Sequence, residues 1–287
     1  MNRSLAILFL LLALAAKPAT AQTFFENREY GISLGGSQYF GDLNDDYGFS
    51  YIRPAGGAFM RIHMNPFIGI RIGGVYTKVG YDDKLSGNYF NKRRNLKFES
   101  DVVEATVQAE FNFFRFFTGE EHSRFTPYLT MGIGAFYYSP YTHFNGVKYY
   151  LRPMGTEGQN AGYGDRQYSN INLCYPIGAG FKYWLRPGLN FGFEIANRFT
   201  NTDYLDDVSA TYVGIENFPS SGSKASAASQ LQDRSYETGT PIGQAGKQRG
   251  VSSTKDQYLT FQFTLSFQLK TYKCPAYLRE GFYNINQ

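Results

Sequence analysis

The chain has 287 residues, of which 18% are aromatic, 31 are glycine and only 18% are charged. It contains no run of about 18 apolar residues, which excludes a membrane-spanning helix. The formal net charge of +4 is small, so the sequence offers no electrostatic basis for binding nucleic acid. A chain this rich in aromatic residues is neither disordered nor collagen-like, and its composition favours a β-rich protein.

Residues 1–21 predict a secretory signal peptide. Arg3 precedes an apolar core at residues 5–16, and small residues stand at the −3 and −1 positions before Gln22. The apolar core is too short to anchor the chain in a membrane. Because Gln22 rather than a cysteine follows the expected cleavage point, the segment does not resemble a lipoprotein signal.

Two segments alternate apolar and polar residues without interruption, at residues 102–113 and 258–270. Successive side chains of a strand point to opposite faces, so this pattern predicts strands with one apolar and one polar face. Their length is close to the roughly 9–11 residues that a tilted membrane strand requires. Weaker segments that follow the same rule are residues 30–40, 55–64, 67–80, 125–138, 172–185 and 189–200.

The connections between these segments alternate in length. A transmembrane β-barrel has short turns at its periplasmic end and long loops outside, and closure satisfies every backbone group in lipid. The sequence therefore predicts an all-β fold, an eight-stranded antiparallel transmembrane β-barrel of the outer membrane with long extracellular loops and periplasmic termini. The long connections are residues 41–54, 81–97, 139–171 and 201–257, and the short ones are residues 65–66, 118–124 and 186–188.

The predicted barrel domain spans residues 22–270 and is followed by a periplasmic tail at residues 271–287. The tail is too short to bury a core of its own. In the longest loop, residues 220–230 are small and polar, and we expect them to be mobile. Export allows a disulfide between Cys174 and Cys274, but the strand order places them at opposite ends, which favours two free thiols.

The inward-facing positions of the predicted strands carry charged residues of both signs. An ion path or a carboxylate pair for acid–base chemistry is one interpretation. We favour a structural network that plugs the bore, because eight strands leave an interior only just wide enough for side chains. The residues of this predicted network are Arg61, Arg71, Glu104, Glu110, Lys182, Glu194 and Arg198, with His63 beside them.

The remaining chemistry-bearing residues do not form a recognisable site. His63, His122 and His143 lack paired spacing for a metal or a catalytic triad. The acidic clusters at 42–46 and 203–207 could bind Ca²⁺, but neither has the register of a calcium loop, and solvated loop acids are favoured. We therefore expect no catalytic residues, no metal and no cofactor.

Aromatic residues gather near the ends of the predicted strands, as in the interfacial girdles of membrane barrels. Aromatic platforms for carbohydrate are the alternative interpretation. The girdle candidates are Tyr39, Phe40, Phe116, Phe117, Tyr137, Tyr138, Tyr183 and Phe199.

Several segments, taken together and in order, resemble the PorG-type outer-membrane protein of the type IX secretion system. They cover most of the mature chain, and no one of them is a catalytic motif. They read YFGDLN (39–44), RFTPYLTMGIGAFYYSP (124–140), LRPMGTEGQ (151–159), PIGAGFKYWL (176–185), TDYLDDVS (202–209) and YKCPAY (272–277).

The resemblance implies a non-enzymatic role in protein export and gliding motility. It also implies partners, namely a periplasmic ring of PorK-like lipoprotein and PorN-like subunits, besides outer-membrane lipid. A plugged barrel cannot pass a folded protein, so the chain is expected to anchor or organise the ring. Lys273, Pro275 and Tyr277 of the tail, with the turn at 118–124, are the expected contacts. The alternatives are a small outer-membrane channel or ligand-binding barrel, and a barrel enzyme.

Overall fold

The structure is a computed structural model, and it describes residues 28–116, 123–218 and 226–268. The predicted signal peptide at 1–21 and the tail at 271–287, which includes Cys274, lie outside the described residues. Most of the turn predicted at 118–124 lies outside them as well.

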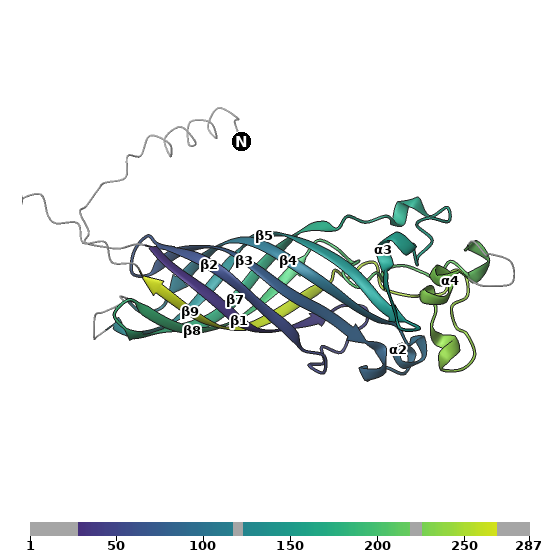
Figure 1. Ribbon diagram of the computed structural model, residues 1–287, viewed down its shortest axis with the longest axis horizontal. Helices are drawn as coiled ribbons and strands as arrows, with labels where there is room; N and C mark the ends of the chain where they lie inside the picture. The colour runs from purple at the N-terminus through teal and green to yellow at the C-terminus, as the bar shows by residue number, and fades with distance from the viewer. Residues whose placement is uncertain (1–27, 117–122, 219–225, 269–287) are drawn as a thin grey trace, which may run out of the picture.

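The fold is a closed antiparallel barrel of eight strands, as the sequence predicts (Figure 1). The strands follow the chain around the wall from β1 to β9, and β4 pairs with β5 to complete the sheet. Pairing of β1 with β9 closes the circle, so the wall has no free edge. The strands are β1 (Arg28–Phe40), β2 (Arg53–His63), β3 (Ile68–Asp82), β4 (Lys97–Asn112), β5 (Phe125–Phe144), β7 (Ile171–Arg186), β8 (Leu189–Thr200) and β9 (Gln257–Gln268).

The connections lie alternately at the two ends of the barrel, as predicted, but they differ less clearly in length than predicted. The connections predicted to be short lie at 64–67, 113–124 and 187–188 and share one end, although 113–124 spans as many residues as 41–52 at the other end. The long ones lie at the other end, where Figure 1 shows helices and loops extending beyond the barrel. We call the structure formed by the long loops the cap.

Three strands extend further into the cap than predicted. β3 and β4 continue their pairing to Asp82 and Lys97. β5 continues to Phe144 and turns back into β6 (Val147–Tyr150), so the predicted loop at 139–171 contains a hairpin. Asn145 and Gly146 form its turn with φ of 51° and 76°, the backbone that favours an Asn-Gly pair in a two-residue hairpin.

Short helices complete the cap. The prediction of a mobile segment at 220–230 is wrong in part, since Ala227 begins helix α4. Ser226 caps this helix, and Leu231 is buried against the rest of the cap. The burial of this one leucine within a polar run explains why a helix forms where the composition predicted a mobile segment. The helices are η1 (Asp83–Leu85), α2 (Tyr89–Arg94), α3 (Leu151–Met154), η3 (Gly164–Arg166), η4 (Ile215–Asn217), α4 (Ala227–Gln232) and η5 (Ser235–Glu237).

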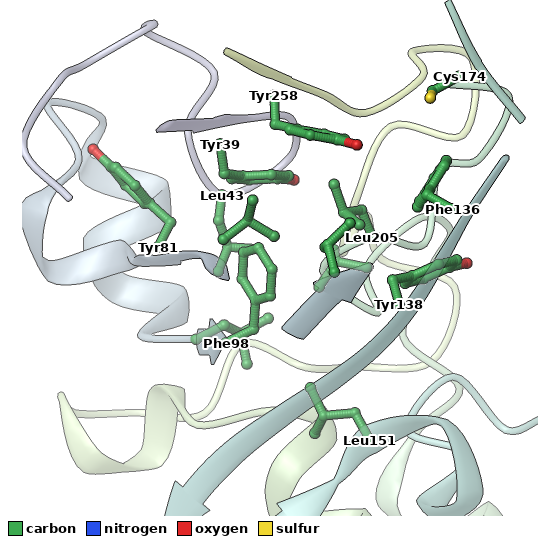
Figure 2. Packing of buried hydrophobic residues seen from close by; sticks show 14 of the residues in the cluster. Tyr39, Leu43, Tyr81, Phe98, Phe136, Tyr138, Leu151, Cys174, Leu205 and Tyr258 are labelled. Atoms are coloured by element: carbon green, nitrogen blue, oxygen red, sulfur yellow. The ribbon is translucent and has the colours of Figure 1, made fainter. Parts of the chain in front are cut away.

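The largest apolar core of the described residues lies where the cap meets the barrel (Figure 2). Tyr39 and Tyr258, which are partners in the β1–β9 register, face Leu43 and Leu205 from the long loops. Phe98 packs edge-on against Tyr39 with ring centroids 4.8 Å apart. The cap is therefore packed on the end of the bore that lies opposite the short turns.

Candidate functional site

The half of the bore nearer the short turns is filled by a network of ion pairs. Arg61 Nη1 donates to Glu29 Oε1 at 2.6 Å, and Arg61 Nε donates to Glu110 Oε2 at 2.7 Å. Lys182 donates to the same Glu110 carboxylate and, at 3.1 Å, to Asn112 Oδ1. Arg71 Nε lies 3.4 Å from Glu110 Oε1, so Glu110 contacts cations from three different strands.

Arg71 connects this group to the opposite wall. It lies directly beside Arg61 in the β2–β3 register, where two like charges would repel. Its guanidinium makes a forked pair with Glu194, at 2.6 and 2.8 Å, and Tyr128 Oη donates to the same carboxylate at 2.7 Å. Because Glu29 pairs with Arg61, Glu194 pairs with Arg71 and Glu110 contacts both, the repulsion is compensated.

A second group lies nearer the cap. Glu104 Oε2 accepts from Arg198 Nε at 3.2 Å and from Tyr258 Oη at 2.6 Å. The thiol of Cys174 lies 3.8 Å from the same oxygen, and Cys174 is buried. This group places a second charged layer above the first.

The structure brings the seven predicted bore residues into these two groups, with every one buried. Sequence analysis missed Glu29, which lies one residue before the predicted start of its strand, and Tyr128. Both occupy inward register positions, so strict alternation would have found them. A charge left buried without its partner is costly in such networks, and the side chains fill the bore rather than line a path through it.

The histidines do not converge. His63 lies in the bore, with Nε2 2.8 Å from Glu29 Oε2. His143 lies on the outward face of β5 near its end, against the ring of Tyr141, and His122 lies outside the described residues. Within the described part of the chain, no three His, Cys, Asp or Glu side chains are arranged to hold a metal ion.

The prediction that the loop acids are solvated is wrong for the second cluster. Asp203, Asp206 and Asp207 are buried in the cap, because the loop that carries them folds over the core instead of extending into water. In the first cluster only Asp45 and Asp46 are exposed.

Burial changes the protonation of these acids. It raises the pKa of Asp203 to about 7 and that of Asp207 to about 6. Burial and the neighbouring carboxylates raise the pKa values of Asp206 and Asp256 well above the ordinary range. The cap therefore holds a group of carboxyls that become protonated at a higher pH than ordinary aspartates.

Two buried arginines connect the cap loops to one another. Arg94 donates two hydrogen bonds of 2.8 Å to the Asp83 carboxylate, and it also donates to the backbone carbonyls of Arg249 and Asp42. Arg249 donates to Glu157 Oε1 at 2.9 Å, and Glu157 also accepts from backbone amides of the longest loop. All four long loops are thereby joined.

The predicted girdle residues differ in exposure according to the strand face on which they lie. Tyr137, Tyr183 and Phe199 lie on the outward face and are partly exposed, as a girdle requires. Tyr39 and Tyr138 are fully buried because they occupy inward positions at the end of the barrel that the cap covers. Phe40 and Phe116 are buried too, and Phe117 lies outside the described residues.

The outer wall of the barrel carries an apolar band. Along β4 and β5 the outward positions are apolar and about half exposed, as a lipid-facing surface requires. They are Val103, Val107, Phe111, Leu129, Met131, Ile133 and Tyr137. At the cap side the band ends where Lys78 faces Asp101 in the β3–β4 register.

No helix among the described residues combines the length and apolar character needed to cross a membrane.

Solved structures of low similarity were found, and no curated protein matches the sequence. Neisserial surface protein A is 9% identical with a TM-score of 0.40, covering 84% of this chain and 97% of that one. Ail, the attachment invasion locus protein of Yersinia pestis, is 11% identical with a TM-score of 0.38, covering 84% and 98%. The outer membrane protein OprG from Pseudomonas aeruginosa is 10% identical with a TM-score of 0.35, covering 85% and 97%.

A family model gives a firmer assignment than these structures. The family described as a domain of unknown function, DUF6089, matches residues 2–218, which is most of the chain, and the protein belongs to that family.

Proposed function

We propose that the protein is an integral outer-membrane component of a type IX protein secretion machinery, in which it anchors or organises the periplasmic ring. The proposal joins two lines of support. The sequence segments that resemble the PorG-type protein support membership of this secretion machinery. The filled bore supports the role of an anchor.

The filled bore is the observation that carries the anchoring role. The fork between Arg71 and Glu194 crosses the interior, and Arg61 bridges Glu29 and Glu110 below it. An eight-stranded barrel has no room for a cargo protein beside these side chains. Export through this bore would require the whole network to leave it.

The proposed orientation follows from the connections. The short turns and the described chain ends, Arg28 and Gln268, lie at the same end of the barrel. In membrane barrels the short turns face the periplasm, which supports the proposal that the cap lies outside the cell. The tail at 271–287 then begins in the compartment of the proposed ring.

The proposed partners are the PorK-like lipoprotein and PorN-like ring subunits. Lys273, Pro275 and Tyr277 of the tail, together with the turn at 118–124, are the proposed contacts. The described strand ends that precede these positions, Asn112 of β4 and Gln268 of β9, lie at the periplasmic end in the proposed orientation, and the cap lies away from the ring.

The experiment is a pull-down of the ring from the native outer membrane. A chain lacking residues 271–287 should recover much less of the ring than the full chain. The matched control lacks residues 219–225, within a loop of the opposite end, and should recover the ring in full. Full recovery with the tail deleted would contradict the proposed contact, and absence of ring subunits from the full-chain sample would contradict the function.

Direct measurements distinguish the proposed anchor from the two alternative functions, a channel and a barrel enzyme. A channel would conduct in planar bilayers, whereas the proposed anchor should show no conductance above background. A barrel enzyme would lose activity on combined substitution of His143→Ala and Asp203→Asn. Secretion should persist in that double variant under the proposed role, since neither residue faces the periplasm.

A further inference from the structure

A cluster of cations and tyrosines lies on the outer wall immediately beyond the apolar band. Tyr76 and Val103 face each other as the last apolar pair, each about half exposed. The next outward pair is Lys78 with Asp101. We call the group that begins there the rim cluster, and it consists of Arg53, Lys78, Lys97 and Lys148 around Tyr51 and Tyr141.

Glu99 holds the two tyrosines in place. Its Oε2 accepts from Tyr141 Oη at 2.9 Å, and its Oε1 accepts from Tyr51 Oη at 3.1 Å and from Arg53. Tyr141 is only 2% exposed although it lies on the outward face of β5. The cluster is thus built around fixed rings and is not a set of loose surface side chains.

The cations gather on these rings. Lys148 Nζ lies 3.6 Å from the centroid of Tyr141, and Lys78 Nζ lies 5.8 Å from the same centroid. Arg53 Cζ lies 4.1 Å from the centroid of Tyr51, and Lys97 Nζ lies 5.8 Å from it. Cation–π contacts at these distances hold positive charge without neutralising it.

The nearby carboxylates cancel this charge only in part, and Lys97 Nζ lies 3.6 Å from Asp82 Oδ2. Glu99 is occupied by Arg53 and the two hydroxyls. Asp101 accepts from Tyr76 Oη at 2.8 Å and lies 3.6 Å from Lys78 Nζ, which is longer than a hydrogen bond. Among the described residues, the ion pairs include no carboxylate partner for Lys148, whose ring contacts are with Tyr141 and Tyr150.

We propose that the rim cluster binds the phosphate groups of the phosphorylated glycolipid in the outer leaflet, with Lys78 and Lys148 as the principal donors. The inference rests on the membrane orientation given under the proposed function. Headgroup phosphates lie just above the hydrocarbon layer, at the level where the apolar band gives way to the cluster. Lysines placed at such a boundary attract anionic headgroups. Lys78 and Lys148 both contact the ring of Tyr141, so their two ammonium groups lie in the same part of the wall.

The test uses the full chain, purified in detergent micelles, and diphosphoryl lipid A as the probe. The wild type should bind this lipid about tenfold more tightly than the same lipid stripped of its phosphates. The double variant Lys78→Gln with Lys148→Gln should lose that preference, and added salt should weaken the wild-type binding. Equal binding of the two lipids by the wild type would overturn the proposal.

Matched variants locate the effect. Lys247→Gln with Lys255→Gln removes two exposed lysines from the cap and should leave binding unchanged, whereas Lys148→Arg should retain it. A slower gel mobility after heating verifies that each variant is a folded barrel. If phosphatidylglycerol binds as tightly as diphosphoryl lipid A, the assignment to the outer-leaflet glycolipid is wrong. Loss of ring recovery in the pull-down would leave this result intact, so the two proposals fail separately.

Discussion

Tyr39 Oη, at the cap end of the first strand, donates a hydrogen bond of 2.6 Å to Asp206 Oδ2, a residue 167 positions further along the chain. The same hydroxyl lies 2.9 Å from Asp256 Oδ1. A phenol has only one proton to donate, so serving both carboxylates requires that one of them be protonated. This junction joins the barrel wall to both ends of the longest loop, and it makes the attachment of the cap sensitive to pH.

The cap should be held more firmly at pH 5 than at pH 8. The folded-state pKa values of Asp203, Asp206 and Asp256 lie above the ordinary range, and that of Asp203 is about 7. Groups whose pKa is raised by folding stabilise the folded state below their unfolded pKa, and this contribution is lost as the pH rises through the folded value. Hydrogen exchange of the loop amides, corrected for the intrinsic rate at each pH, measures the effect.

The Leu205 amide reports this junction directly, because it donates to Asp256 Oδ2 at 2.8 Å. Its protection should fall between pH 6 and pH 8 in the wild type and change less in Asp203→Asn. Asp165→Asn, at an exposed carboxyl of another loop, is the control and should behave as wild type. Protection that is independent of pH would exclude a titrating junction.

Removal of the shared hydroxyl should loosen the cap and leave the barrel intact. Tyr39→Phe leaves the ring in place against Phe98 and removes the donor to the two carboxylates. Buried groups left without a partner cost about 1–3 kcal/mol. We expect faster proteolysis of the longest loop at pH 8, with the heat-dependent gel shift of the barrel unchanged. Tyr258→Phe, which removes a hydroxyl from the bore instead, should leave loop proteolysis near the wild-type rate.

The wall of the barrel was predictable because successive residues of each strand face the bore and the outside in turn, so their polarity alternates. The alternation that exposes Val103 and buries Glu104 places each charged bore residue without any knowledge of its partners. The same reasoning underestimated β5, since the pattern becomes polar on both faces beyond Tyr138. The Asn145-Gly146 pair was the available signal for the hairpin there.

The cap was not predictable, because its core forms between loops that are distant in sequence. The residues next to Asp206 in the sequence predict a solvated acid. Asp206 is buried because the fold brings Tyr39 and Asp256 together with it. Leu231 is likewise a single apolar residue in a polar run. Burial by long-range contacts leaves no period in the sequence, so neither residue could be assigned.

Breaking the central ion pair of the bore should destabilise the barrel strongly. Arg71→Ala leaves the buried Glu194 carboxylate with Tyr128 as its remaining donor among the contacts described above. Removal of one partner of a buried pair costs about 3–5 kcal/mol, whereas replacement of both by apolar residues is often neutral. Urea unfolding in micelles should show a large loss for Arg71→Ala and a much smaller one for Arg71→Met with Glu194→Met. Equal losses in the two variants would mean that the pair fills space without electrostatic coupling.

The inward and outward faces of β7 can be distinguished by chemical labelling. Cys174 faces the bore and is fully buried, whereas its neighbour Leu173 faces outward and is 43% exposed. In a Cys274→Ser background, a membrane-permeant maleimide should leave Cys174 unlabelled until the barrel is unfolded by heat. Adding Leu173→Cys with Cys174→Ser should give rapid labelling of the folded barrel, because a one-residue step reverses the face of a strand. Labelling of native Cys174 at the rate of the outward thiol would show that the register of β7 against β5, which pairs Cys174 with Gly134, is shifted by one residue.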